Sequence, residues 1–209
     1  LRQHQQALMD ALLPALRLNL ENPPDIGGLF SRPRRDLWLE IGFGGGEHLA
    51  FQARQNPEIG FIGCEPFING LAKLLVQAEA AELSNIRLHD QDARDLLAWL
   101  PGACLGRVFV LYPDPWPKKR HWKRRIIAAE TVEELARVMK PGAELRIASD
   151  IDDYVDWILR HVLRHDAFCW TARRPADWRR PFADWPGTRY EAKALREGRV
   201  PAYLTFIRR

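Results

Sequence analysis

The chain has 209 residues, of which 46% are hydrophobic and 28% charged, the proportions of an ordinary soluble globule. Its net charge is only +4, but Lys and Arg are clustered, most densely at residues 118–125, which is typical of a nucleic-acid-binding face or of a solvated surface. No apolar run reaches the ~20 residues of a membrane span, and three cysteines without CxxC spacing argue against disulfides or a zinc site. We therefore expect a cytoplasmic protein without a metal or a membrane partner.

The first helix is expected from about residue 6 to 20, where leucines at helical spacing precede Asn22-Pro23-Pro24. Strand and helix patterns then alternate along the chain. The expected strands are 37–41, 59–64, 86–89, 107–111, 144–148, 168–170 and 203–207. The expected later helices are about 47–54, 68–83, 93–100, 122–139 and 152–164.

Strands that alternate with helices predict a mostly parallel sheet with right-handed crossovers and helices on both faces. The last two strands are separated by a long segment in which no helix is expected, and they predict an antiparallel edge. No repeat or linker divides the chain, so we expect one domain over residues 1–209, an α/β three-layer sandwich with a seven-stranded sheet and the first helix appended.

A glycine-rich turn follows the first strand at residues 40–46, Glu-Ile-Gly-Phe-Gly-Gly-Gly. Gly42 and Gly44 would let the backbone approach a ligand closely, although glycine loops also occur as plain turns. Two acids favour a ligand site. Glu40 ends an otherwise apolar strand, and Glu65 ends the next strand, where a carboxylate can accept hydrogen bonds from both hydroxyls of a ribose.

The turn departs from the dinucleotide-binding pattern at Glu47, where a third glycine would stand. A negative charge at a helix N-terminus opposes a pyrophosphate. A positively charged nucleoside cofactor without phosphate fits better, and S-adenosylmethionine is such a cofactor, with Glu40 facing its amino-acid end and Glu65 its ribose. Asp92, after the third strand, stands where it could meet the adenine amino group, cap the following helix, or do both.

The most informative motif is Tyr112-Pro113-Asp114-Pro115-Trp116-Pro117, which follows a buried strand and leads into six cations within residues 118–125. Its prolines make the turn rigid. A rigid carboxylate beside clustered positive charge indicates chemistry on an anionic substrate. The cations either grip phosphates, which positions RNA without reading its sequence, or form a solvated helix face.

Residues 39–44, the Pro113–Trp116 turn with its basic tail, and residues 187–191 resemble, in that order, bacterial tRNA (guanine-N7)-methyltransferases. The resemblance runs from about Leu37 to the C-terminus and is most specific at the turn. It implies a class I methyltransferase (Rossmann-like) fold, S-adenosylmethionine as methyl donor and tRNA as partner. It also implies N7 of the variable-loop guanosine, position 46, as the methylated atom. Members tend to begin with a basic segment, so we expect part of a tRNA-binding arm to lie outside this sequence.

The resemblance also assigns roles to individual residues. Cofactor contacts fall on Glu40, Glu65, Asp92 and Asp114, of which Asp114 is the expected catalytic residue. Substrate-binding positions fall on Lys118, Asp150, Thr188, Arg189, Tyr190 and Glu191. The residues expected to contact RNA are Lys119, Arg120, His121, Lys123, Arg124 and Arg125. Members often have Lys-Phe at 189–190, so charge and aromatic character are kept. Asp150 could instead cap the next helix, and the 188–191 run could be loop structure only.

The chemistry of guanine N7 sets what such a site must do. N7 carries a free lone pair, so the protein mainly has to orient it and exclude water, which contributes up to roughly 7–11 kcal/mol. Asp114, Asp150 or Glu191 could stabilise the cationic product or accept hydrogen bonds from the guanine N1–H and amine. Trp116 or Trp122 could stack on a splayed base, and Trp122 could equally pack in the core.

Three other functions remain open. A methyltransferase for another RNA target, such as an exocyclic amine of adenine, uses a similar turn of polar, proline and aromatic residues. A nicotinamide-dependent oxidoreductase is opposed by Glu47 and by the lack of a proton-donor pair. A non-catalytic RNA-binding protein with a decayed site is opposed by the acids at 40, 65, 92 and 114. The oligomeric state, monomer or homodimer, is left open.

Overall fold

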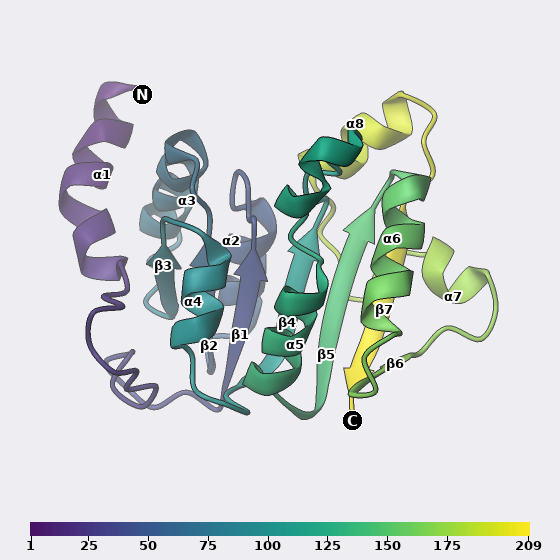
Figure 1. Ribbon diagram of the computed structural model, residues 1–209. Coiled ribbons are helices and arrows are strands. Elements are labelled where there is room, and N and C mark those ends of the chain that lie inside the picture. The colour runs from purple at the N-terminus through teal and green to yellow at the C-terminus, as the bar shows by residue number, and fades with distance from the viewer.

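The computed structural model describes residues 1–209 and contains one seven-stranded sheet, in the order β3-β2-β1-β4-β5-β7-β6 (Figure 1). The strands are β1 (Asp36–Ile41), β2 (Ile59–Cys64), β3 (Ile86–His89), β4 (Leu105–Leu111), β5 (Met139–Ser149), β6 (Phe168–Trp170) and β7 (Ala202–Arg208). The helices are α1 (Gln3–Leu16), α2 (Glu47–Gln55), α3 (Ile68–Ala80), α4 (Ala93–Trp99), the 3-10 helix η1 (Lys119–Arg124), α5 (Ala129–Val138), α6 (Asp152–Val162), α7 (Ala176–Arg179) and α8 (Arg189–Arg196).

The central strands bury side chains on both faces of the sheet, because successive residues of a strand point to opposite sides. Leu39 and Ile41 join a core of 31 buried residues that includes residues of α4, α5 and α6. Trp38 joins the other core, of 20 buried residues, which includes residues of α1, α2 and α3. Figure 1 shows α4, α5 and α6 on the near face and α1 beyond α3 at one end. The sheet is therefore covered on both faces, as parallel strands require.

The predicted α/β fold and its antiparallel strand are confirmed. The strands from β3 to β5 are parallel neighbours, whereas β7 runs antiparallel to both β5 and β6, and so stands one place in from the edge that β6 forms. Because Ala202 at the start of β7 pairs with Ser149 at the end of β5, the segment before β7 arrives where the parallel strands finish.

Three predicted elements need correction. The first helix ends at Leu16 and not near residue 20, because Arg17 adopts an extended backbone and bridges to Leu88 of β3. The predicted helix over 122–139 is divided into η1 and α5, since the backbone is extended at Arg125 and at Ala128. The segment between β6 and β7 is not free of helices, because it contains α7 and α8.

No helix combines the length and the apolar character that crossing a membrane requires. No group of three or more His, Cys, Asp or Glu side chains is arranged to hold a metal ion.

Candidate functional site

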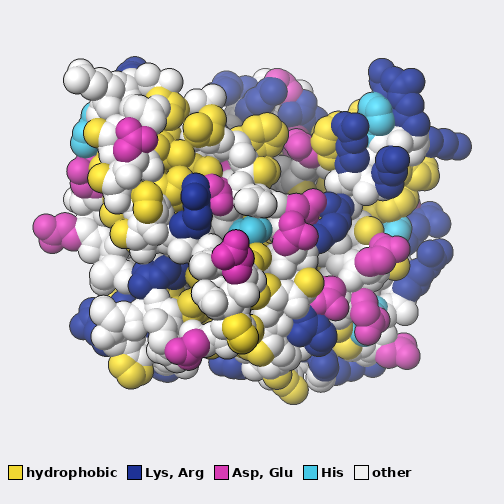
Figure 2. All heavy atoms as spheres, turned by 60° about the vertical axis from the view of Figure 1, so that its left-hand side comes forward, with side chains coloured by type: hydrophobic (Ala, Val, Ile, Leu, Met, Phe, Trp, Pro, Cys, Tyr) yellow, Lys and Arg dark blue, Asp and Glu magenta, His cyan; other side chains and the backbone are white.

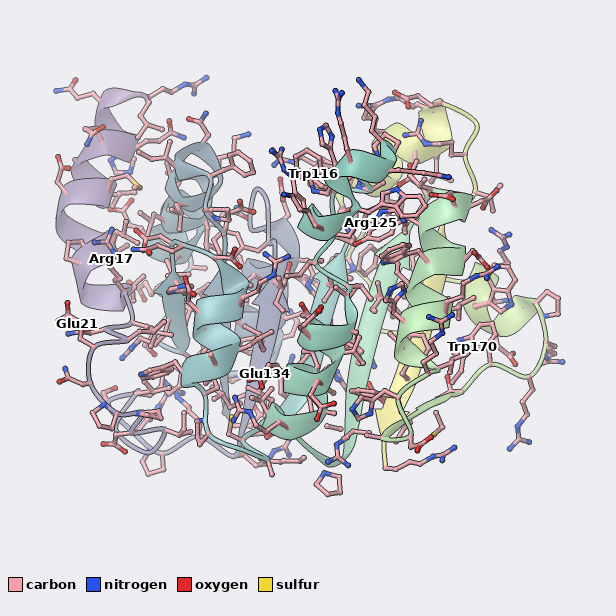
Figure 3. All side chains as sticks on the ribbon, viewed as in Figure 1. Arg17, Glu21, Trp116, Arg125, Glu134 and Trp170 are labelled. Atoms are coloured by element: carbon pink, nitrogen blue, oxygen red, sulfur yellow. The ribbon has the colours of Figure 1, made fainter.

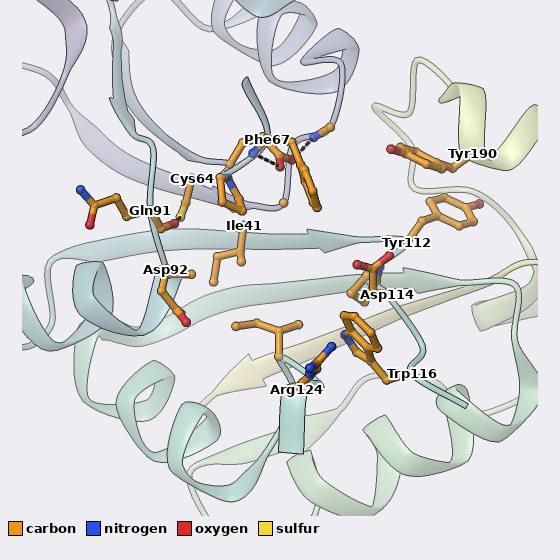
Figure 4. Close-up of a pocket in the computed structure, with 17 residues that line it drawn as sticks. Ile41, Cys64, Phe67, Gln91, Asp92, Tyr112, Asp114, Trp116, Arg124 and Tyr190 are labelled. Carbon is orange, nitrogen blue, oxygen red and sulfur yellow. Dashed lines mark hydrogen bonds between the residues drawn. The ribbon is translucent and has the colours of Figure 1, made fainter. Parts of the chain in front are cut away.

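A cavity of about 340 Å³ opens at the carboxyl ends of β1, β2 and β4, beside the loop after β3 (Figure 4). Its volume lies within the roughly 300–1,000 Å³ typical of small-molecule sites. The strand order reverses between β1 and β4, and ligands of open α/β sheets bind at such a point. The sequence-predicted residues that line the cavity are Gly42, Gly44, Glu65, Asp92, Asp114, Trp116, Arg124 and Tyr190.

Glu65 connects the two loops that form the base of this cavity. The Gly44 N–H donates to its Oε2 at 2.7 Å and the Phe67 N–H to its Oε1 at 3.0 Å. Burial raises the pKa of the Glu65 carboxyl, and the two backbone hydrogen bonds oppose that rise. Each carboxylate oxygen can accept a second hydrogen bond, so Glu65 keeps acceptor capacity for a ligand.

Gly44 has the positive φ of +57° that favours glycine, and a Cβ at this position would lie 2.9 Å from Cε2 of Tyr190. The absence of a side chain therefore brings α8 against the glycine loop. Gly42 has a φ of +73°, and no other atom lies within 4 Å of the position that a Cβ would occupy. Both predicted glycine positions thus have a conformational reason for glycine.

Glu40 does not line the cavity. It is buried, and its Oε2 lies 2.7 Å from Nδ1 of the equally buried His48 in α2. Gln52 follows one turn later, and its Nε2 donates to the backbone oxygen of Asp184 at 3.1 Å. His48 was not predicted from the sequence, although its place as the second residue of the helix after the glycine loop was a usable signal. Contact between Glu40 and a cofactor stays a prediction.

The Pro113–Trp116 turn is held in a strained conformation. Tyr112, immediately before the turn, and Trp116, at its end, have φ values of +52° and +41°, which are rare for bulky side chains and are often found at functional sites. The Tyr112 N–H donates to the Ala148 oxygen at 2.7 Å, so the first of these residues is tied to β5. Asp114 lies exposed between them and forms no hydrogen bond or ion pair within the protein. Its carboxylate is therefore free to bind a ligand.

Arg125 was predicted to contact RNA, and that prediction is wrong. Its side chain is 1% exposed, and it donates from Nε to the Pro115 oxygen at 2.7 Å and from Nη2 to Asp153 at 2.9 Å. The guanidinium also lies over the rings of Trp122 and Trp157, 5.0 and 4.6 Å from their centroids. Figure 3 shows it between η1 and α6. Arg125 thus anchors the turn, because an arginine can satisfy its charge with a carbonyl, a carboxylate and aromatic faces.

The other cations of the basic run remain at the surface. Arg124 lines the cavity, with its guanidinium 4.9 Å from the centroid of the Trp116 ring. None of the cations at 118–124 has an acidic partner within ion-pair distance, unlike Arg125. These cations are Lys118, Lys119, Arg120, Lys123 and Arg124. The His121 ring contacts the edge of the Trp116 ring. Trp122 is half-buried and packs against Trp157, with ring centroids 5.1 Å apart, and stacking of Trp122 on a base stays a prediction.

Two acids predicted for the site have partners within the protein. Asp92 accepts a hydrogen bond from the Arg94 N–H at 2.9 Å, so it does cap α4, and it still lines the cavity. Asp150 forms an ion pair with Arg199 at 2.5 Å, whereas the N-cap of α6 is Ile151. The idea that Asp150 caps this helix is therefore wrong, and its arginine partner was not apparent from the sequence.

The residues at 188–191 are the start of a helix. Thr188 is the N-cap of α8, and its Oγ1 accepts a hydrogen bond from the Glu191 N–H at 3.1 Å. The spacing Thr-x-x-Glu is also the signature of a helix N-terminus, which could have revealed α8. Glu191 accepts hydrogen bonds from Trp185 Nε1 at 2.8 Å and from the Tyr203 hydroxyl. The Tyr190 ring stacks on Tyr112, with centroids 6.5 Å apart.

Comparison with known proteins identifies the family. A family model described as "Putative methyltransferase" matches residues 34–203. Relatives named tRNA (guanine-N(7)-)-methyltransferase are 55% identical to this chain over its whole length in both Mesorhizobium japonicum and Agrobacterium fabrum, where 90% and 91% of the relative is covered. The chain belongs to the tRNA (guanine-N7)-methyltransferase family. The resemblance predicted from the motifs is thus confirmed.

Solved structures support the same fold. The 16S rRNA methyltransferase KamB matches with a TM-score of 0.63 at 20% identity, covering 84% of this chain and 89% of that one. A mutant 16S rRNA (adenine(1408)-N(1))-methyltransferase from Catenulisporales acidiphilia with its cosubstrate SAM matches with a TM-score of 0.60 at 18% identity, covering 84% and 87%. At these identities the likeness shows the class I methyltransferase fold.

Because Arg125 is buried, its substitution should lower the stability of the fold. Arg125→Ala removes a charged donor from the Pro115 carbonyl and leaves a void among aromatic rings, so it should lower the free energy of unfolding by about 2–3 kcal/mol. Lys123→Ala, at an exposed position two residues earlier, should change it by less than about 0.5 kcal/mol. Urea denaturation of both variants measures the difference. Equal stability of the two would contradict the anchoring role.

Proposed function

We propose that this protein transfers a methyl group from S-adenosylmethionine to N7 of the guanosine at position 46 in the variable loop of tRNA. The observation that carries the proposal is the cavity itself. The cavity combines the glycine loop, the buried carboxylate of Glu65, which is placed to bind a ribose, and the free carboxylate of Asp114 beside surface cations. The chain also belongs to this methyltransferase family. Because tRNA is the substrate, the proposed location is the cytoplasm.

The residues of the cavity fit S-adenosylmethionine. Glu65 keeps acceptor sites for two ribose hydroxyls, Asp92 stands after β3 for the adenine end, and Gly42 leaves room for close approach of the ligand. Glu47, at the first turn of α2, makes this helix N-terminus unsuited to a phosphate. When bound, S-adenosylmethionine supplies an electrophilic methyl group.

Asp114 is the proposed catalytic residue because it is the free acid. Asp150 and Glu191 already have partners in Arg199, Trp185 and Tyr203, whereas Asp114 has none. Its carboxylate can accept hydrogen bonds from the guanine N1–H and amine, which orients N7, and it can stabilise the positive charge that develops on the methylated ring. No general base is required, because the N7 lone pair is already free.

The tRNA is bound, in this proposal, by the exposed cations of η1 and the residue before it. These residues hold phosphates without reading bases, while the aromatic faces of Trp116 and Tyr190 at the cavity offer stacking surfaces for an unpaired guanine. Base recognition then depends on Asp114. Arg189, at the start of α8, is a further substrate-binding residue in this proposal.

Methyl transfer to an unmodified tRNA transcript tests this function. The protein should transfer label from S-adenosylmethionine to the transcript with guanosine at the variable-loop position and not to one with adenosine there, and reductive cleavage should map 7-methylguanosine to that position. Label on both transcripts would refute the assigned target, and label on neither would refute the function.

Asp114→Asn tests the catalytic residue separately. This variant keeps the shape of the side chain but removes its charge, so turnover should fall by roughly 100-fold or more. The unfolding midpoint should stay close to that of the unaltered protein, because Asp114 is exposed and has no partner within the protein. The matched control is Asp166→Asn, which neutralises an exposed acid far from the cavity residues and should leave turnover unchanged. Equal turnover of the two variants would remove Asp114 from the mechanism.

The raised pKa of Glu65 predicts how cofactor binding depends on pH. Only the ionised Glu65 carboxylate can accept hydrogen bonds at both oxygens. The affinity for the cofactor should therefore be highest at pH values above the pKa that Glu65 has in the ligand-free protein. It should decline as the pH falls through that pKa, which burial has moved above its ordinary 4.5. Calorimetric titration with S-adenosylhomocysteine from about pH 8 to pH 5 measures this. Glu65→Gln should bind more weakly and show a flatter profile, and an unchanged profile would refute the role.

A further inference from the structure

A stripe of cations lies on the outward face of α8. Arg189, Lys193 and Arg196 are spaced i, i+4 and i+7, which places them on one side of an α-helix. The opposite side is packed on the protein, where Ala194 is completely buried and Glu191 accepts the Tyr203 hydroxyl. The stripe therefore points into solvent along about 10 Å of helix.

Acidic neighbours neutralise this stripe only weakly. Arg189 lies 4.0 Å from Glu47, at the limit of an ion pair, and Lys193 lies 4.0 Å from Glu197. Glu197 is itself engaged by Arg199. Arg196 has no acid within ion-pair distance and is exposed. A net positive surface remains, which attracts phosphates.

The stripe begins next to the cavity that the basic run also borders. Tyr190, in the first turn of α8, lines the cavity together with Arg124 of η1. Cations thus flank the cavity from two elements that are far apart in sequence. Figure 2 shows Lys and Arg side chains at the upper end of the molecule, and others along its lower edge.

We propose that Lys193 and Arg196 form a second phosphate-binding surface, which holds the tRNA backbone on the opposite side of the target nucleotide from η1. This inference rests on the proposed function. When a nucleotide is extruded into the cavity, its backbone crosses the opening. The phosphates on both sides of that nucleotide then lie against the protein surface. The basic run binds one side, and α8 binds the other. Such contacts set position and affinity without base specificity.

The test compares two double variants that each remove two positive charges. Lys193→Ala with Arg196→Ala removes the proposed grip, and alanine suits a helix. The matched control is Arg32→Ala with Arg35→Ala, two exposed arginines before β1, at the opposite end of the sheet. The measurement is the Kd for unmodified tRNA between 50 and 200 mM salt, with S-adenosylhomocysteine affinity as a check on folding.

Two lost phosphate contacts should lower the slope of log K against log salt by about 1.4–1.8, so that the loss of affinity across this salt range shrinks by about tenfold. The control pair should keep the slope of the unaltered protein. An unchanged slope for the α8 variant, in a protein that still binds and methylates tRNA, would overturn this inference alone. A protein that neither binds nor methylates tRNA would overturn the proposed function as well.

Discussion

The carboxylate of Glu65 fixes the geometry on which the site depends. It accepts the Gly44 and Phe67 N–H groups at the same time, so the turn after β1 and the turn after β2 are held together by one buried side chain. Gly70 of α3 then approaches the same loop so closely that a Cβ would lie 2.2 Å from the Gly44 oxygen. Because these contacts involve backbone atoms, the cavity is largely formed before a ligand arrives.

The opposite wall of the cavity is a strained turn with a buried anchor. Positive φ values at Tyr112 and Trp116 cost conformational energy, which the surrounding contacts must offset. Arg125 supplies such contacts through the Pro115 carbonyl, Asp153 and the aromatic rings around it. One arginine of the basic run thus holds the turn in place. The rest of the run stays at the surface, and Asp114 remains free at the cavity.

The antiparallel strand β7 explains how the C-terminal part of the chain reaches the site. Its direction places the preceding segment at the carboxyl end of the sheet, where Trp185 and Tyr203 hold Glu191 and where Tyr190 covers the glycine loop. A parallel strand in this position would deliver that segment to the other end. Two basic elements, η1 and α8, therefore flank one cavity.

The sequence by itself determined the alternation of strands and helices, the glycine turn and the acids at the strand ends, because these depend on local patterns and on the shared direction of parallel strands. It also identified the family, since the Pro-Asp-Pro-Trp turn with its basic tail is specific. Only the tertiary structure decided which charges are free. Arg125 is buried, Asp150 is paired with Arg199, and Glu40 is paired with His48. A side chain's partners come from other elements, and no local pattern records them.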